Sequence, residues 1–372
     1  MKRKYIWKIS LAFTLGFLLL LLLQWYYDYN YTPAVTNKLT NYTKVNNYIK
    51  SFQQNNKSEE PFFKIPTGVF IQSIDFITPE TIHVSGYVWQ EIPKSYLELG
   101  ITPGIIFPES INPDNSEVTL AYEDDQKDYK LYGYYFENDL FQSFSYANYP
   151  LDKKNIWLRM WPKDFYKNVI LTPDLRSYQK NIAIFGIDHK IVLRNFNLIE
   201  TYFSYEILTY NTDFGLEKFE DHEKFPELYF NIVLKRHLST LLFIYLIPIS
   251  VIWGVIFGML VIITSNEKQS KKFFFNVSSI LSSSALLFIT LAIIHTNLRS
   301  RFLGYQVIYI EYFYLISYLL VAFLILTAYI IQRGEKAPKF LTWEDSLLPK
   351  ALFWPLLFLV LNLITFIHFW VY

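Results

Sequence analysis

Four long apolar segments fill the C-terminal third of the chain. Each is long enough to cross the roughly 30 Å hydrocarbon core of a bilayer as a helix. Only 18% of the 372 residues are charged, a lower share than the ~25% of ordinary soluble proteins. The sequence therefore predicts a multi-pass membrane protein. The expected spans are 239–264, 274–295, 307–331 and 351–372.

A further apolar segment lies at the N-terminus. Basic residues at its start precede the apolar run Ile9–Leu23, and the aromatic residues 25–27 follow it. A basic flank, an apolar core and an aromatic belt are typical of a signal peptide or of an uncleaved signal anchor. No small-x-small cleavage site follows directly, which favours an anchor over residues 1–27. The positive-inside rule then places the N-terminus in the cytoplasm.

The region between these apolar segments has the pattern of an all-β domain. Residues 28–61 are polar and predict a spacer, with weak helical signals over 33–52. Residues 62–237 contain short alternating runs separated by turn clusters, which predict a sandwich or barrel. We thus expect an extracellular all-β sandwich, a four-helix transmembrane bundle over 238–372, and an additional N-terminal signal-anchor helix. The expected strands are 69–76, 81–90, 116–122, 130–136, 155–161, 168–171, 181–185, 191–198, 202–210 and 227–235.

Charge and composition exclude several classes of protein. The loops 265–272 and 332–350 are rich in Lys and Arg, so we expect them in the cytoplasm, with the β-domain and the C-terminus outside. The predicted location is the plasma (inner) membrane. The net charge of +1 gives no field for nucleic acid, and the chain has no Cys for disulfides or thiolate chemistry. With no phosphate loop, HExxH or GxSxG motif, we expect neither an enzyme nor a cofactor or metal.

The second C-terminal span carries a polar stripe. At ~100° per residue, six residues of the segment 273–300 fall within one narrow sector of the helix. The stripe is compatible with a buried helix whose Ser side chains bond to their own carbonyls. It is also compatible with a pore-lining helix that has a hydroxyl ring and a hydrophobic gate at Ile289. The stripe consists of Ser278, Ser282, Ala285, Ile289, Ala292 and Thr296.

Several motifs recur in an order that is known from one family. Tyr149-Pro150-Leu151-Asp152 has the form of an aromatic-Pro-x-Asp turn, and Arg236 lies twelve residues before Pro248 in the first span of the four. The run 276–298 has the residue types and length of a pore helix and its exit. Together these motifs resemble the pentameric ligand-gated ion channels, particularly their cysteine-free prokaryotic members. The resemblance covers roughly residues 62–372, so the N-terminal segment falls outside it.

The resemblance implies a homopentameric channel, opened by a small extracellular ligand or by protons. It implies that the helix 274–296 lines a pathway for permeant ions and that membrane lipid surrounds the bundle. It also implies a coupling interface between the β-domain and the helices, in which charged residues pair. The alternative is an ordinary surface pair. The coupling candidates are Glu80, Tyr149, Pro150, Asp152 and Arg236.

The ligand site of the resembled family lies between subunits and is lined by aromatic residues. Such a cage suits a cationic amine through cation–π attraction. However, the chain contains 30 Tyr and 33 Phe, so aromatic residues are expected in any loop. The tryptophan that this family often carries in its binding loops is not evident. The candidates are Tyr134, Tyr135, Tyr202, Phe203, Phe214, Phe219 and Phe225.

Histidines offer a second way to sense the outside. His222 lies in the acidic segment 217–227, which is either a cation or proton sensor or a solvated loop. His237 opens the first span of the four and His295 ends the striped helix, so both are candidates for proton gating. Lys271 and Lys272 at the inner mouth favour anions whereas Glu267 favours cations, and the selectivity stays open. The alternative function is a non-conducting, membrane-anchored receptor, and a transporter ranks last because internal repeats are not evident.

Overall fold

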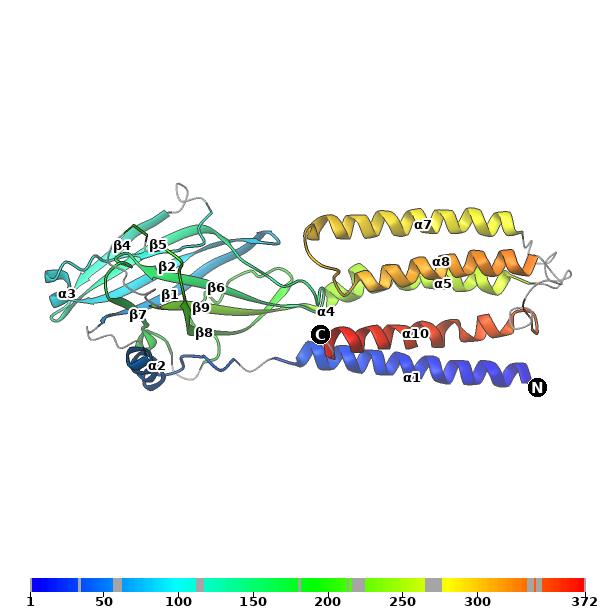
Figure 1. The fold of residues 1–372 in the computed structure, drawn as a ribbon, viewed down its shortest axis with the longest axis horizontal. Coiled ribbons are helices and arrows are strands. Elements are labelled where there is room, and N and C mark those ends of the chain that lie inside the picture. Colours follow the sequence, from blue (N-terminus) through cyan, green and yellow to red (C-terminus); the bar gives the residue numbers. More distant parts are fainter. Residues whose placement is uncertain are drawn as a thin grey trace. The chain divides into compact units, whose positions relative to one another are not determined.

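The protein divides into two compact units in a computed structural model. One, here called the helix unit, comprises Met1–Thr32, Ser145–Asp152 and Arg236–Tyr372. The other, the β-unit, comprises Pro33–Phe144 and Lys153–Lys235. Figure 1 shows the helices and strands with their labels. The structure describes residues 2–32, 35–55, 62–111, 117–179, 182–212, 214–215, 225–264, 276–332, 338 and 343–370.

Two sheets build the β-unit, with strand orders β4-β5-β2-β1-β7 and β3-β6-β9-β8. A two-residue turn between β1 and β2 sets their register, so that Thr78 faces Thr81 and Phe70 faces Tyr87. Gly86 allows the two strands to approach closely, because a Cβ there would lie 2.2 Å from the carbonyl oxygen of Phe70. The strands are β1 (Phe63–Thr78), β2 (Thr81–Pro93), β3 (Ile105–Ile106), β4 (Glu117–Asp125), β5 (Tyr129–Phe141), β6 (Lys153–Pro162), β7 (Val169–Pro173), β8 (Phe196–Leu208) and β9 (Phe225–Arg236).

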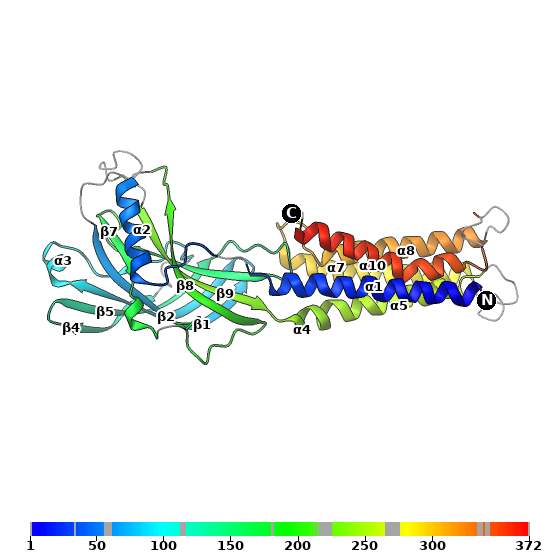
Figure 2. The same cartoon turned by 90° about the horizontal axis from the view of Figure 1, so that it is seen from below.

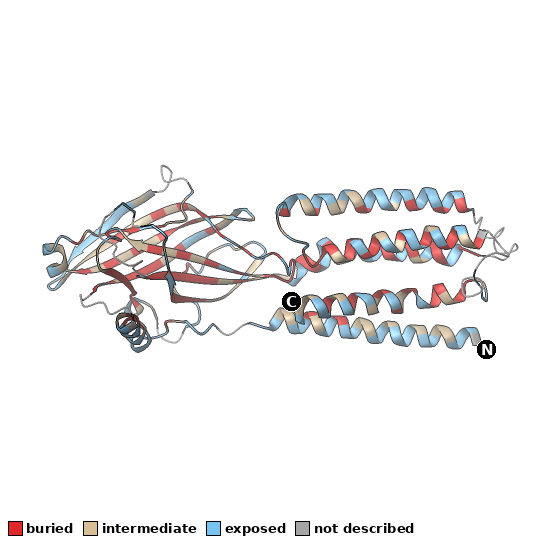
Figure 3. Cartoon of the chain, viewed as in Figure 1, coloured by how far each residue is buried: buried red, intermediate tan, exposed pale blue. Residues whose placement is uncertain are grey.

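The core of the β-unit draws residues from both sheets, as the buried positions in Figure 3 show. Phe203 and Phe230 are fully buried with ring centroids 5.0 Å apart, and Phe185 packs 6.0 Å from Phe230. Tyr205 donates a hydrogen bond of 2.8 Å from its buried hydroxyl to the carbonyl of Leu171. Burial of aromatic rings at this density supplies most of the stabilisation of such a sheet pair.

Helix α2 (Tyr42–Asn55) covers part of the β-unit in the region expected to be a spacer. Asn41 caps it, since its side-chain oxygen accepts a bond of 2.9 Å from the backbone N–H of Lys44. Its buried Val45 and Ile49 and the ring of Tyr48, 5.0 Å from Tyr205, form the packing face. The weak helical signals over 33–52 therefore correspond to a docked helix.

Most expected strands are present, and the differences have local causes. Two strands were expected over 191–198 and 202–210, but the structure has the single continuous strand β8 there. The prediction of a strand at 181–185 is wrong over its described part, 182–185. Phe185 bonds instead to the side chain of Thr201, which accepts its N–H and donates to its carbonyl, both at 2.8 Å. The short β3 and the helix α3 (Lys94–Glu98) were not expected.

The helix unit contains five helices that are long and apolar enough to cross a membrane, counted over the described residues. This is consistent with the predicted multi-pass membrane protein. In Figures 1 and 2, α1 runs beside α10, and Figure 1 shows α5 beside α8. Leu238 begins α4, which passes through a π-helical turn into α5. The elements are α1 (Lys2–Asn30), α4 (Leu238–Thr240), the π-turn η3 (Leu241–Leu246), α5 (Ile247–Ile262), α7 (Val277–Arg299), α8 (Glu311–Gln332) and α10 (Leu347–Trp370).

Specific polar bonds join α1 to its neighbours. The amide of Asn362 donates to the carbonyl of Phe17 at 2.8 Å, and the hydroxyl of Ser10 donates to the carbonyl of Ala351 at 2.5 Å. The indole N–H of Trp25 donates to the hydroxyl of Tyr309 at 2.6 Å. In an apolar setting each such group needs a partner, so these bonds fix the face that α1 presents.

Phe203→Ala should destabilise the protein by roughly 3–5 kcal/mol, because it removes a fully buried ring and leaves a cavity. The measurement is a denaturant titration of the full-length protein in detergent. Ile207→Ala, at an exposed position on the same strand, is the control and should change stability little. An unchanged midpoint for Phe203→Ala would show that this ring is not part of the core.

Candidate functional site

The segment Ser145–Asp152 is the part of the β5–β6 connection that belongs to the helix unit. Tyr146 is buried, with its ring 5.0 Å from Phe302 and 5.1 Å from Tyr305. The backbone N–H of Tyr309 donates to the carbonyl of Ala147 at 2.8 Å. That of Ile310 donates to the carbonyl of Tyr149 at 3.2 Å. The segment is therefore fixed to the connection between α7 and α8 through both backbone and side chains.

A buried ion pair lies at the end of this segment. Arg236 donates from Nε to Oδ1 of Asp152 at 2.7 Å and from a terminal nitrogen to Oδ2 at 3.2 Å. The two side chains are only 9% and 3% exposed. Burial by itself would lower the pKa of Arg236, but the charge and hydrogen bonds of Asp152 raise it above its ordinary value. A two-point pair of this kind is directional as well as strong.

Aromatic rings surround the ion pair. The guanidinium of Arg236 lies 4.8 Å from the ring centroid of Tyr149, within the range of cation–π attraction. The hydroxyl of Tyr149 is 2.6 Å from that of Tyr245 in the π-turn η3. Burial, followed by the charge of Asp152, raises the pKa of Tyr146 far above the physiological range. The phenol of Tyr146 therefore stays protonated beside the pair.

The structure brings together four of the five predicted coupling residues, Tyr149, Pro150, Asp152 and Arg236, within the helix unit. Glu80, the fifth, lies in the turn between β1 and β2 of the β-unit, where its carbonyl accepts a bond of 2.7 Å from the N–H of Gln142. Its role as a third member of the charge cluster stays a prediction.

The polar stripe of α7 lies away from the surface that α7 buries. Its buried side holds Leu291 and Leu298 and faces the helix unit, mainly α8. Five of the six stripe residues are exposed in the single chain, and Ala292 is half-buried. The side chain of Asn276 caps the helix by accepting from the N–H of Ser278 at 2.9 Å. The inner-mouth residues Lys271 and Lys272 lie outside the described residues.

His295 packs on α8 near the C-terminal end of the stripe. Its ring stacks on Tyr314 at 5.2 Å, and its Nε2 lies 3.5 Å from the buried carboxylate of Glu311, which also pairs with Arg299. His237 precedes α4 as a half-buried N-cap residue without a side-chain capping bond. Phe219 and His222 lie outside the described residues.

An aromatic cluster forms at the ends of β6 and β8 in the β-unit. Trp161 lies 5.4 Å from Phe165, 5.6 Å from Tyr210 and 6.2 Å from Phe214, between ring centroids. Phe214 also packs 5.6 Å from Phe165 and 5.7 Å from Tyr210, and it is 44% exposed. We call these four residues the aromatic cluster. A partly open group of rings is the arrangement that favours a cation.

Charged side chains line the same place. Arg159 bonds Glu109 at 2.5 Å and Glu227 at 3.3 Å, and its guanidinium lies 5.6 Å from the ring of Trp161. Tyr210 donates a short hydrogen bond to Glu227. One arginine and two carboxylates leave one negative charge in excess. The buried Nε of Arg159 and Nε1 of Trp161 have no hydrogen-bond partner among the described residues.

Of the aromatic residues singled out from the sequence, Phe214 belongs to this cluster. Tyr202 and Phe203 are buried in β8, whereas Tyr135 contacts Tyr87 and donates to Glu137 on the sheet surface. Burial raises the pKa of the half-buried Tyr134 to about 12. The sequence reasoning missed Trp161, Phe165 and Tyr210. The signal is positional, since Trp161 and Tyr210 stand at the ends of expected strands and Phe165 lies in the short connection between two of them.

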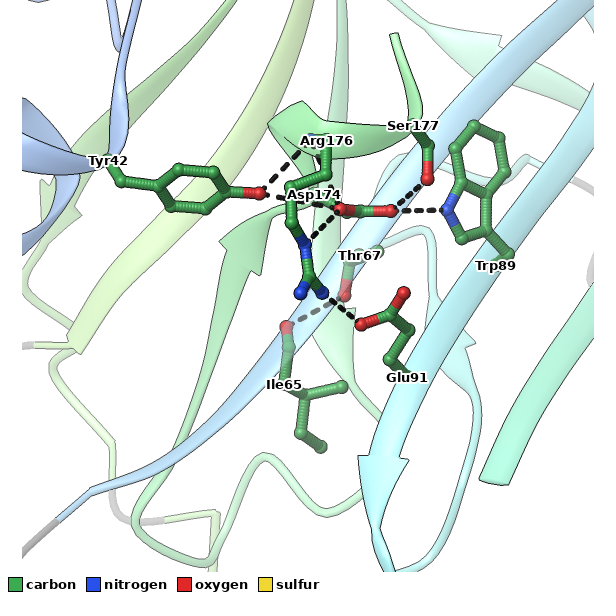
Figure 4. Close-up of polar contacts among 8 residues, drawn as sticks. All are labelled: Tyr42, Ile65, Thr67, Trp89, Glu91, Asp174, Arg176 and Ser177. Atoms are coloured by element: carbon green, nitrogen blue, oxygen red, sulfur yellow. Dashed lines mark hydrogen bonds and ion pairs between the residues drawn. The ribbon is translucent and has the colours of Figure 1, made fainter. Parts of the chain in front are cut away.

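A second polar cluster centres on Asp174, shown in Figure 4. This fully buried carboxylate accepts from the indole of Trp89 at 3.0 Å, from Tyr42 at 3.4 Å and from the hydroxyl of Ser177. The backbone N–H of Arg176 donates to it at 3.3 Å. Because both oxygens already have partners, the cluster fastens α2 to β2 and does not present a binding surface. The described residues contain no group of three His, Asp or Glu side chains arranged for a metal.

No family model and no curated protein matches this chain in sequence.

Replacing either member of the Asp152–Arg236 pair should destabilise the full-length protein by about 3–5 kcal/mol, because the remaining charge is left buried without its partner. The double variant Asp152→Leu/Arg236→Met should be more stable than either single variant. Denaturant titrations of all four proteins form a double-mutant cycle.

The half-buried pair Lys38–Glu200, which is more open to water, provides the control for that cycle. Its atoms approach to 2.6 Å, but its side chains are 25% and 21% exposed. Lys38→Met should cost no more than about 1 kcal/mol. Equal losses at the two pairs would contradict a special role for the buried one.

Glu109→Gln should change how stability depends on pH. Burial raises the pKa of Glu109 above its ordinary 4.5, although Arg159 opposes the shift. A raised pKa in the folded state means that folding disfavours the carboxylate, so this contribution is present at low pH and is lost as the pH rises through the folded-state pKa. The stability of Glu109→Gln relative to wild type should therefore increase as the pH rises above 4.5. Thermal unfolding of both proteins between acidic and neutral pH measures this, and a stability difference that stays constant with pH would contradict it.

Proposed function

We propose that the chain is the subunit of a homopentameric ligand-gated ion channel, with a β-sandwich sensor and a pore lined by α7. The observation that carries the proposal is the fixed segment Ser145–Asp152, bound by the Arg236–Asp152 pair. Arg236 ends β9 and stands directly before the first C-terminal span. The same segment bonds the connection that follows α7 through Tyr309 and Ile310. The start of β6 thus follows Asp152 directly in the chain, and the end of β9 is Arg236. These two residues bond to each other next to the ends of the helices.

This arrangement gives a route from sensor to pore. A rotation of β6 or β9 would move Asp152 and Arg236 together, since they form one buried pair. Movement of Tyr149 would then shift the carbonyl that binds Ile310 and the hydroxyl that binds Tyr245. Coupling between a ligand site and a pore requires an element with two arrangements, whose equilibrium both sites can shift. In this proposal that element is the segment Ser145–Asp152.

The exposure of α7 supports its role as the pore helix. Hydroxyls on a membrane helix need water or a polar partner. Ser278 and Ser282 of α7 are exposed in the single chain, on the side of the helix away from the buried Leu291 and Leu298. Copies arranged around an axis would place these faces together around water. Ser278 and Ser282 then form polar rings, and Ile289 forms a hydrophobic constriction that gates by dewetting.

The aromatic cluster is the proposed ligand site. Its four rings and its excess carboxylate favour an organic amine over an anion. Protons acting on His295 remain the second candidate stimulus, because His295 faces the buried Glu311. In this proposal the protein lies in the plasma membrane, with the β-unit and the C-terminus outside and the N-terminus in the cytoplasm.

Native mass spectrometry of the detergent-solubilised protein should show five subunits. In membranes, a charged thiol reagent should modify Ser278→Cys, Ser282→Cys and Ile289→Cys, because these positions face water in the open state. The natural chain has no Cys, so its background labelling is zero. Thr290→Cys is the matched control, as it is exposed in the single chain but off the stripe.

A monomer or dimer would remove the ring and favour the alternative, a non-conducting receptor whose β-unit binds a partner. Labelling of Leu287→Cys instead of Ile289→Cys would refute the assigned face. Five subunits without stripe labelling under any stimulus would retain the assembly and exclude the conducting pore.

A further inference from the structure

The helix unit contains an apolar cavity of about 390 Å³ between α1, the π-turn η3, α5, α8 and α10. Its volume is within the ~300–1,000 Å³ range of ligand pockets. Leu21 and Trp25 of α1 form one wall, and Leu241 of η3, Trp253 of α5 and Phe313 of α8 form the floor. These five side chains are at most 8% exposed. The cavity is thus built by residues that are far apart in the sequence and buried together.

The polar groups near the cavity are engaged elsewhere. The indole N–H of Trp25 donates to Tyr309, and that of Trp253 donates to the hydroxyl of Ser317 at 2.8 Å. The lining contains two hydroxyl residues: Ser250 donates to the carbonyl of Ile247 at 2.9 Å, and Tyr26 lies exposed at the mouth. A polar ligand would lose its hydration against walls made almost entirely of apolar side chains, so the cavity favours an apolar occupant.

The mouth of the cavity opens on the outer surface of the helix group. Lining residues Leu22, Tyr26 and Leu242 are 47%, 71% and 48% exposed, in contrast to the floor. They belong to α1 and to the π-turn, both part of candidate membrane spans. In a bilayer this opening faces hydrocarbon chains. A helix about 10–12 Å in diameter is too wide for a cavity of this size, whereas a single flexible chain is not.

We propose that this cavity is a lipid site that takes one acyl chain of a membrane phospholipid. The chain enters between α1 and η3 and lies against Trp25, Trp253 and Phe313. Irregular π-helical turns often mark functional sites, and here η3 forms the wall opposite α1. Tyr309 bonds Trp25 through its side chain and Ala147 through its backbone, so an occupant that orders Trp25 also supports the fixed segment Ser145–Asp152.

The test uses the full-length protein in vesicles of phosphatidylcholine that carries a photoreactive diazirine in its acyl chain. After illumination, mass spectrometry of peptides should locate the label on Leu21 and on η3 above the level on the exposed face of α1. Leu21→Trp and Leu246→Trp fill the cavity from opposite walls. Each should reduce the cavity labelling roughly tenfold, the factor expected when contact with about two methylene groups is lost.

Neighbouring positions outside the lining provide matched controls. Leu20→Trp and Ile247→Trp add the same indole at exposed sites and should leave cavity labelling unchanged. Unfolding temperatures of all four variants identify any that has lost its fold, and the two filling variants report independently.

Labelling of the cavity no higher than that of the exposed face, or labelling that persists in both filling variants, would overturn the proposal. Capture of a second copy of the chain at this cavity would also overturn it. The same holds if a probe with the diazirine in its headgroup labels the floor as strongly as the acyl probe. None of these readouts depends on conduction or on subunit number, so the result stands apart from the proposed channel function.

Discussion

The arrangement of the helix unit depends on one buried ion pair. Asp152 and Arg236 lie 84 residues apart in sequence, yet they bond through two contacts with almost no exposed surface. Removing two charges from water is costly, and the attraction between them offsets that cost only when geometry and further bonds are favourable. Here Tyr149 lies beside the guanidinium, which adds cation–π attraction. Such a pair adds little net stability. It favours one arrangement over the others, because every arrangement that separates the two residues leaves a charge buried alone.

Tyrosine hydroxyls extend this principle along the helix ends. Tyr309 is buried and links Trp25 of α1, Thr365 of α10 and the backbone of Ala147. Tyr149 and Tyr245 bond each other in the same manner. Apolar packing among membrane helices is non-directional, since lipid chains are as apolar as leucine. Directional bonds at a few tyrosines therefore decide which faces meet.

Prediction from the sequence was most successful for features that a single physical quantity determines. Length and apolar content alone identify the spans, and the pairing of Asp152 with Arg236 was expected from the resemblance of their motifs to the pentameric channels. Loops and registers were harder. The segment 182–185 has the composition of a strand, but Thr201 takes the backbone bonds of Phe185, and no local pattern reveals that partner. The aromatic cluster depends on which strand ends meet, so Trp161 could not be separated from the many other aromatic residues of the chain.

The N-terminal helix has a packing face that its apolar composition does not reveal. A leader or simple anchor needs only to be apolar, and from composition α1 fits either. Yet Ser10, Phe17, Leu21 and Trp25, spaced by seven, four and four residues, fall on one side of the helix. Ser10, Phe17 and Trp25 bond their neighbours through side chain or carbonyl, and Leu21 is the most buried residue of α1. The opposite side exposes leucines such as Leu19 and Leu23. A face with matched partners on α10 and at Tyr309 goes beyond what targeting requires, because targeting requires only an apolar segment with a basic flank.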